Sequence, residues 1–298
     1  MTTAQRARIN ADLRSAPPVT GGVDQLREGF ARFMSTMALP AGTVTTETGL
    51  GGRRAVLVER ERNPATGTIL YLHGGSHVFG SPETAMVLTA NLVLRTGFRS
   101  YSLDYRLAPE HPFPADVEDC LAAYRALLDQ GTDPGTVVLA GDSAGGGLVV
   151  TTLLAARDAG LPLPAAGLAL SGGFDASRTG ESMRTKVGID PIFTPAGLGR
   201  TGPLYVGDVD VLHPWLSPAV TADLAGLPPL MLQVGTDELL LDDSTRLAAR
   251  ARDAGVDVVL DVTAGVPHVF QSWAGVLDEA DDALDRAAFF LGQRLGRR

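Results

Sequence analysis

From Thr68 onward, short apolar runs alternate along the chain with longer stretches of helical periodicity. Several of these runs are apolar at every position, which is typical of parallel strands covered on both faces. The alternation therefore predicts a mostly parallel sheet flanked by helices. The expected strands are Thr68–Leu72, Ser100–Asp104, Val137–Ala140, Gly167–Leu170, Leu230–Val234 and Val256–Val262. The expected helices are Glu83–Arg95, Ala115–Leu128, Ala144–Asp158 and Asp243–Ala254.

Two earlier runs, Val44–Thr48 and Ala55–Glu59, flank a glycine-containing turn at Gly49–Gly52. This arrangement predicts an antiparallel hairpin. With the hairpin, the expected sheet has eight strands.

The composition excludes several classes of partner. The net charge is −9 and no cluster of Lys and Arg stands out, so we expect neither nucleic acid nor an anionic membrane surface as a partner. Cys120 is the only cysteine, so no intrachain disulfide is possible. We find neither a signal-peptide pattern nor a run of apolar residues long enough to span a membrane, and we expect a cytoplasmic protein.

The strongest chemical signal is Gly-Asp-Ser-Ala-Gly at Gly141–Gly145, between an apolar strand and a helix. A nucleophile at such a sharp turn sits in strained backbone, and glycines two residues before and after it avoid clashes. The following helix directs its first amides toward the place where negative charge develops. Ser143 is therefore the predicted nucleophile.

A serine hydroxyl needs a general base to become a good nucleophile. The chain has five histidines, and only His213 and His268 follow Ser143. In proteins with this turn the histidine follows the last strand, as His268 does. His213 lies instead within a Gly- and Pro-rich insertion. We predict His268 as the base.

The acid that orients the base should lie just beyond the end of a strand. Asp237 closely follows the expected strand Leu230–Val234, directly after Gly235 and Thr236. Asp242 and Asp243 are close competitors, but they begin the next helix, where N-capping would explain them. Asp237 is therefore the predicted acid, accepting a hydrogen bond from the imidazole of His268.

The strand that ends at Leu72 is followed by a His-Gly-Gly-Ser-His turn. Exposed backbone amides in such a turn could stabilise the oxyanion of a tetrahedral intermediate. The predicted donors are the amides of Gly74, Gly75, Ser76 and Ala144.

Two regions break the alternation of strands and helices. Residues 1–40 are expected to form one or two amphipathic helices, and residues 175–225 form a long insertion that should fold as a small subdomain. We interpret the two regions as a helical cap over the active-site end of a single domain, 1–298. In the alternative, the N-terminal helices simply pack on the core. The apolar residues at helical spacing in the N-terminal region are Leu26, Phe30, Phe33, Met34 and Met37.

At this point the chain resembles the bacterial hormone-sensitive-lipase-like esterases, from about residue 68 to its end. The family is marked by His-Gly-Gly-Gly and Gly-Asp-Ser-Ala-Gly-Gly, and Ser76 stands here for the third glycine while His77 replaces a bulky aromatic. In the family the second and third glycines donate their amides, which correspond to Gly75 and Ser76. The matching segments are Asp104–Ala115, Gly141–Gly146, Thr236–Leu239, Gly265–His268, Ser182–Arg184 and Pro214–Pro218.

The resemblance implies an α/β-hydrolase fold, a two-part cap, and hydrolysis without a cofactor or metal. It also implies a preference for short or medium acyl chains, and homodimers paired through the last strand and helix. The predicted function is therefore hydrolysis of carboxylic esters through an acyl-enzyme on Ser143. Lactone hydrolysis and deacetylation of a natural product or sugar use the same machinery and remain alternatives. A non-catalytic small-molecule receptor on this fold is a remote alternative.

Overall fold

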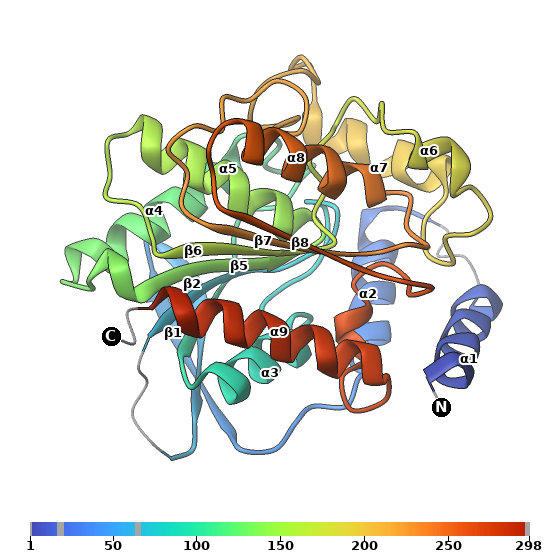
Figure 1. The fold of residues 1–298 in the computed structure, drawn as a ribbon, viewed down its shortest axis with the longest axis horizontal. Coiled ribbons are helices and arrows are strands. Elements are labelled where there is room, and N and C mark those ends of the chain that lie inside the picture. The colour runs from blue at the N-terminus through green and yellow to red at the C-terminus, as the bar shows by residue number, and fades with distance from the viewer. Residues whose placement is uncertain (1, 17–20, 63–66, 296–298) are drawn as a thin grey trace.

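The computed structural model describes residues 2–16, 21–62 and 67–295. Within these ranges one sheet has eight strands, in the order β1-β2-β4-β3-β5-β6-β7-β8 (Figure 1). β1, β2 and β4 are paired antiparallel, and all other neighbours are parallel. The strands are β1 (Thr43–Leu50), β2 (Arg53–Arg60), β3 (Thr68–Leu72), β4 (Arg99–Leu103), β5 (Val137–Asp142), β6 (Ala166–Leu170), β7 (Leu230–Gly235) and β8 (Val258–Thr263).

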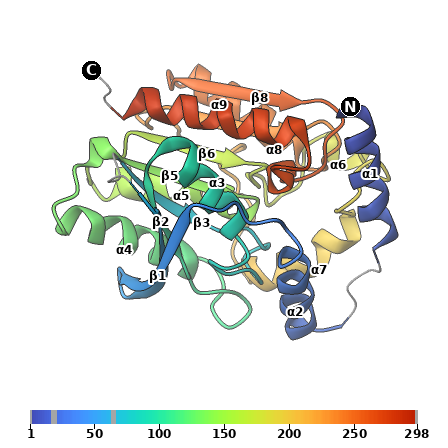
Figure 2. The same cartoon turned by 90° about the horizontal axis from the view of Figure 1, so that it is seen from below.

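Five helices cover the two faces of the sheet (Figures 1 and 2). α3 (Met86–Thr96) and α9 (Asp278–Arg294) lie on one face. On the other face lie α4 (Ala115–Asp129), α5 (Ala144–Asp158) and α8 (Leu241–Asp253). Two short 3₁₀ helices, Pro134–Thr136 and Phe270–Trp273, complete the connections. The predicted mostly parallel, helix-flanked sheet with an antiparallel hairpin is confirmed.

The predicted elements differ from the observed ones only at their ends. The strand Thr68–Leu72 and the helix Ala144–Asp158 have the predicted bounds. Helix α3 begins later than expected, because Ser81 and Thr84 first form a turn in which the Ser81 amide donates to Thr84 Oγ1 (2.9 Å).

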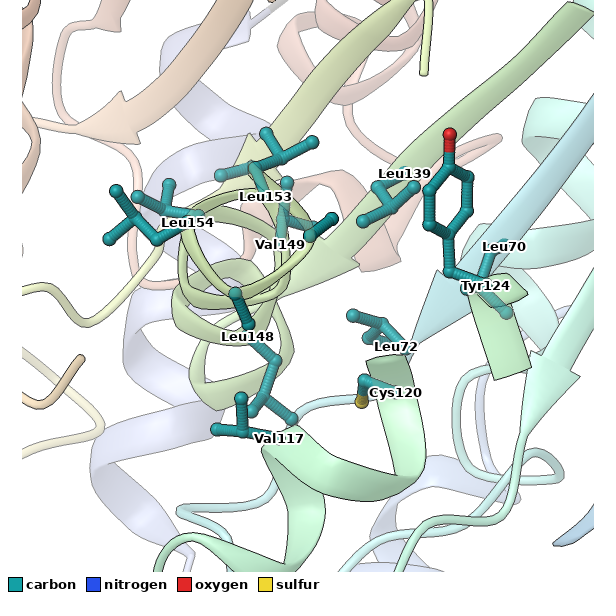
Figure 3. Packing of buried hydrophobic residues seen from close by; sticks show 14 of the residues in the cluster. Leu70, Leu72, Val117, Cys120, Tyr124, Leu139, Leu148, Val149, Leu153 and Leu154 are labelled. Carbon is teal, nitrogen blue, oxygen red and sulfur yellow. The ribbon is translucent and has the colours of Figure 1, made fainter. Parts of the chain in front are cut away.

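The central strands are buried because successive side chains enter two different cores. Leu70 and Leu72 of β3 pack with residues of α4 and α5 (Figure 3). Ile69 and Tyr71 of the same strand pack with residues of α3 and α9. Both sets of side chains are therefore apolar, which explains the unbroken apolar runs in the sequence.

The remaining helices lie beyond the carboxyl ends of the parallel strands (Figure 1). They are α1 (Thr2–Ser15), α2 (Val23–Met34), α6 (Ser182–Thr185) and α7 (Pro195–Val206). α7 begins at a proline, and the preceding Thr194 accepts a hydrogen bond from the Gly197 amide (3.0 Å). None of the helices in the described ranges has the length and apolar character needed to cross a bilayer.

Candidate active site

Ser143 lies at the turn between β5 and α5, with φ of 52°. A β-carbon at Gly145 would lie 1.9 Å from the carbonyl oxygen of Leu72, and one at Gly141 would lie 2.5 Å from the carbonyl oxygen of Gly145. Both glycines are therefore required by contact with backbone, as the sequence pattern predicts. The turn lifts Ser143 to the carboxyl edge of the sheet, where its side chain lines a cavity.

His268 lies beside Ser143, although the two residues are far apart in the chain. Its Nε2 is 2.9 Å from Ser143 Oγ. The imidazole is buried, and the ring of Phe193 covers it with a centroid distance of 4.6 Å. The structure thus brings together the predicted nucleophile and the predicted base at hydrogen-bonding distance.

The carboxylate beside His268 belongs to Glu238, and the placement expected for Asp237 is wrong. Glu238 Oε2 is 2.8 Å from His268 Nδ1, and Glu238 is fully buried. Asp237 is partly exposed and accepts a hydrogen bond from Thr236 Oγ1 (3.2 Å). Both residues lie in the turn after β7, where a step of one residue redirects the side chain.

Further contacts fix the carboxylate of Glu238. Its Oε1 accepts hydrogen bonds from Ser171 Oγ (2.8 Å) and from the Gly235 amide (2.5 Å). Ser171 Oγ in turn accepts from the Val269 amide (3.0 Å), directly after His268. One signal for Glu238 was present in the sequence, since the apolar run Leu239–Leu241 follows it directly. A carboxylate beside such a run is a candidate for burial with a specific partner.

The rejected competitors have structural roles. Asp243 Oδ2 accepts from the amides of Phe174 (2.7 Å) and Asp175 (2.9 Å). Asp242 Oδ2 accepts from the Ser182 amide (2.8 Å). Neither aspartate is the N-cap that we expected, because α8 begins after Leu240 and these carboxylates bind other loops. His213 Nδ1 accepts from the Trp215 amide (3.2 Å), away from Ser143.

Three amides are free to act as oxyanion donors. Within the described ranges, the amides of Gly75, Ser76 and Ala144 have no hydrogen-bond acceptor. The Gly74 amide, which we also expected as a donor, bonds instead to Asp142 Oδ1 (3.1 Å). Gly75 and Ser76 have φ of 126° and 53°, so Ser76 keeps the left-handed backbone of a glycine.

Asp142 connects the nucleophile turn with the oxyanion turn. Its Oδ1 accepts from Tyr71 Oη (2.8 Å) as well as from the Gly74 amide. Burial raises the pKa of Asp142 to about 6, although these hydrogen bonds and the charge of His268 oppose the rise. A β-carbon at Gly74 would lie 2.2 Å from Asp142 Oδ2, so only glycine allows this contact.

His77 fixes the far side of the oxyanion turn. Its Nδ1 is 2.7 Å from the buried Asp116 Oδ2. Its ring stacks on Tyr205 of α7, with centroids 3.7 Å apart, and Tyr205 Oη donates to Asp116 Oδ1 (3.1 Å). The histidine that replaces an aromatic residue therefore still stacks, and it also links the turn to α7.

The cavity beside Ser143 has a volume of about 410 Å³. Ser76, Ser143 and Ala144 line one side, and residues of α7 and the segment after it line the other. Within the described ranges, no group of His, Cys, Asp and Glu side chains has an arrangement that could hold a metal ion. The residues that line the cavity from α7 and its flank are Leu198, Gly199, Thr201, Gly202, Pro203, Tyr205, Val206, Gly207, Val209, Val211, Trp215 and Leu216.

The chain is similar in sequence to known proteins. A family model described as "alpha/beta hydrolase fold" matches residues 69–272. An acetyl-hydrolase of Streptomyces hygroscopicus is 41% identical over 273 residues, which are 92% of this chain and 88% of that protein.

Solved structures agree with the sequence relatives. An esterase from the bacterial hormone-sensitive lipase family superposes with a TM-score of 0.94 at 42% identity, covering 98% of this chain and 99% of that one. The protein EstE5, in a crystal soaked with p-nitrophenyl butyrate, gives a TM-score of 0.92 at 38% identity, covering 98% of both chains. The fold is thus shared with an esterase of known structure.

The raised pKa of Asp142 predicts a pH-dependent difference in stability between the protein and Asp142→Asn. A buried acid whose folded pKa is about 6 contributes stability that is fully present below its ordinary pKa near 3.8, and this stability is lost as the pH rises through 6. Asparagine stays neutral and keeps an oxygen acceptor for Tyr71 and Gly74. We therefore expect the stability of the parent relative to the variant to fall between pH 4 and pH 7, by an amount of the order of a few kcal/mol.

Thermal unfolding monitored by circular dichroism at several pH values measures this difference. Asp129→Asn is a suitable control, because Asp129 is exposed at the end of α4. A gap in melting temperature that is constant across this pH range would contradict the neutralisation of Asp142.

Proposed function

Because the chain belongs to the bacterial hormone-sensitive lipase family of the α/β-hydrolase fold and is a serine carboxylic ester hydrolase, we propose that Ser143, His268 and Glu238 form its catalytic triad. The carrying observation is the continuous chain of contacts from Ser143 Oγ through both ring nitrogens of His268 to Glu238 Oε2. A base oriented by a buried carboxylate is what nucleophilic catalysis by a serine requires.

In the proposed reaction, Ser143 Oγ attacks the ester carbonyl carbon while its proton moves to His268 Nε2. Glu238 holds the proton on Nδ1 and stabilises the imidazolium that forms. When the tetrahedral intermediate collapses, the leaving alkoxide takes the proton from Nε2 and an acyl-enzyme remains. Water then repeats the sequence, releasing the carboxylic acid and restoring Ser143.

The amides of Gly75, Ser76 and Ala144 are the proposed oxyanion hole. Their freedom from other acceptors supports this role, because preorganised donors cost no reorganisation when the negative charge develops. Ala144 is the first residue of α5, so the positive end of the helix dipole adds to the same stabilisation.

We propose short- to medium-chain esters as substrates. The cavity volume of about 410 Å³ supports this range, and so does the acetyl group named for the Streptomyces relative.

We also propose that residues 1–40 and 175–225 act together as a cap. Arg14 of α1 supports this, since its guanidinium donates to the carbonyls of Gly188 (3.0 Å) and Ile189 (2.5 Å) in the second region. Arg27 of α2 also donates from Nε to the Val78 carbonyl (3.0 Å) beside the oxyanion turn. Phe30 of α2 packs on Phe79 in the same loop, with ring centroids 4.9 Å apart.

Hydrolysis of 4-nitrophenyl butyrate tests the proposed nucleophile. We expect Ser143→Ala to lower kcat by about 10³-fold or more, since the acyl-enzyme can no longer form. The matched control is Ser244→Ala, because Ser244 is buried on α8 and its Oγ has no hydrogen-bond partner within the described ranges. A Ser143→Ala enzyme as active as the control would refute the proposal, and a panel of chain lengths, acetates and lactones defines the substrate range.

A comparison of Glu238→Gln with Asp237→Asn tests the proposed acid. We expect Glu238→Gln to lower kcat by about 10²–10⁴-fold, because an amide no longer enforces the productive tautomer of His268. Asp237→Asn should stay within about twofold of the parent. Both measurements use the same ester, with circular dichroism to verify folding. The reverse ranking would restore Asp237 as the acid.

We also propose that the protein forms a homodimer through β8 and α9. Strand β8 is at the edge of the sheet, and Val259, Leu260 and Val262 on it are exposed. Phe289 of α9 is 68% exposed. An exposed apolar edge strand can add its unpaired backbone groups to a second copy.

Light scattering coupled to size-exclusion chromatography measures this association. We expect the mass of two chains for the parent at micromolar concentration, and a shift toward one chain for Val259→Lys, which places a charge on the edge. A parent protein that elutes with the mass of one chain would contradict the dimer.

A further inference from the structure

Arg178 lines the same cavity as Ser143. It lies in the segment after β6, with φ of 55°, in a left-handed conformation that is uncommon for a residue with a side chain. The proposed reaction does not use the side chain of Arg178.

The guanidinium group of Arg178 lies against α7. Its Nη2 donates to the carbonyl oxygen of Leu198 (2.9 Å). A β-carbon at Gly202 would lie 2.7 Å from the same nitrogen, so the glycine provides the space that the guanidinium occupies. Within the described ranges this is the only hydrogen bond of the group, and no carboxylate lies within ion-pair distance. Most of its five N–H donors therefore remain available.

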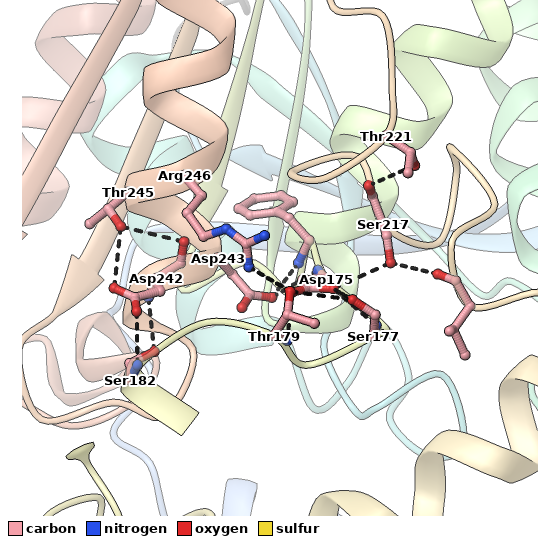
Figure 4. A network of polar contacts seen from close by, with 12 residues as sticks. Asp175, Ser177, Thr179, Ser182, Ser217, Thr221, Asp242, Asp243, Thr245 and Arg246 are labelled. Atoms are coloured by element: carbon pink, nitrogen blue, oxygen red, sulfur yellow. Dashed lines mark hydrogen bonds and ion pairs between the residues drawn. The ribbon is translucent and has the colours of Figure 1, made fainter. Parts of the chain in front are cut away.

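The neighbouring carboxylates are satisfied by other groups (Figure 4). Asp175 Oδ2 pairs with Arg246 Nη1 (2.8 Å) and accepts from the amide and hydroxyl of Thr179 (2.9 and 2.8 Å). Asp243 also lines the cavity, and burial raises its pKa to about 7, which reduces the negative charge near Arg178 around neutral pH. Arg178 interacts with the charges of Asp243 and Asp175 at longer range, but within the described ranges it forms a close ion pair with neither.

A partly buried guanidinium without an anion is costly, and burial lowers the pKa of Arg178 while the group stays charged. The cost is repaid when a carboxylate enters, because a guanidinium matches the two oxygens of a carboxylate with charge-assisted hydrogen bonds. The remaining walls of the cavity are largely apolar side chains such as Leu198, Val206 and Leu216. An anionic group would therefore find its recognition site at Arg178.

We propose that Arg178 binds a carboxylate carried by the substrate, so that the enzyme prefers esters with an anionic group on the acyl or alcohol part. The inference rests on the proposed ester hydrolysis at Ser143 and specifies its substrate class. Arg178 acts here as a specificity-determining residue: it binds the substrate and moves no proton.

Two pairs of esters separate the acyl and alcohol sides. Monoethyl glutarate and ethyl methyl glutarate differ by one carboxylate on the acyl side, and ethanol release follows both. The 3-acetoxypropanoate ion and its methyl ester differ in the same way on the alcohol side, and acetate release follows both. For each pair the readout is the ratio of kcat/KM for the charged ester to that for the neutral ester.

We expect Arg178→Met to lower this ratio by about 10–100-fold in at least one pair, the loss typical of a hydrogen bond to a charged group. The pair affected identifies the side on which the carboxylate is carried. Arg184→Met is the matched control: it removes the same charge from an exposed arginine that pairs with Glu181 outside the cavity. Its ratios should equal those of the parent.

The outcomes are distinct. An Arg178→Met enzyme with both ratios unchanged overturns the inference, even if its kcat/KM falls equally for charged and neutral esters. If this variant does not fold, inhibition of the parent enzyme decides: glutarate should inhibit 4-nitrophenyl butyrate hydrolysis at least tenfold more tightly than dimethyl glutarate, and equal inhibition overturns the inference. A parent that does not hydrolyse 4-nitrophenyl butyrate refutes the proposed function itself.

Discussion

The close approach of α5 to β3 is the constraint on which the rest of the site depends. Gly145 lies directly against the carbonyl of Leu72, and no other residue leaves room for this contact. The contact holds the strained turn at Ser143 and brings the first amide of α5 next to the turn that follows β3. Nucleophile and oxyanion donors are thus positioned by one piece of helix–sheet packing.

A buried carboxylate reinforces the same junction. Asp142 precedes the nucleophile and accepts from Tyr71 and Gly74, which belong to the neighbouring strand and its turn. Burial of this acid is unfavourable in its charged form, as the rise of its pKa to about 6 indicates. The hydrogen bond from the Gly74 amide to Asp142 fixes the turn. The amides of Gly75 and Ser76 that follow it therefore remain free.

The fold, the nucleophile Ser143 and the base His268 could be predicted from the sequence, because they depend on local pattern and on order along the chain. Unbroken apolar runs specify strands covered on both faces, and the glycines around Ser143 specify the turn. Two assignments depended instead on the direction of a side chain or amide within a turn. Glu238, not Asp237, faces His268, and the Gly74 amide faces Asp142 and not the cavity. Spacing along a chain identifies such a turn, but only packing decides which of its groups point inward.

The structure also separates the chemistry from the choice of substrate. The groups that perform the proposed reaction lie on the ends of β5 and β7 and on the loop after β8, elements fixed by the two cores. The opposite wall of the cavity comes from α7, whose polar contacts with the surrounding elements include Tyr205 to Asp116 of α4 and Arg178 to Leu198. A change in this wall can alter the shape and charge of the cavity without moving Ser143. Arg178 lies in the segment after β6 and donates to Leu198 of α7, so its charge is held beside this wall. A substrate can therefore be selected at Arg178 without any movement of Ser143, His268 or Glu238.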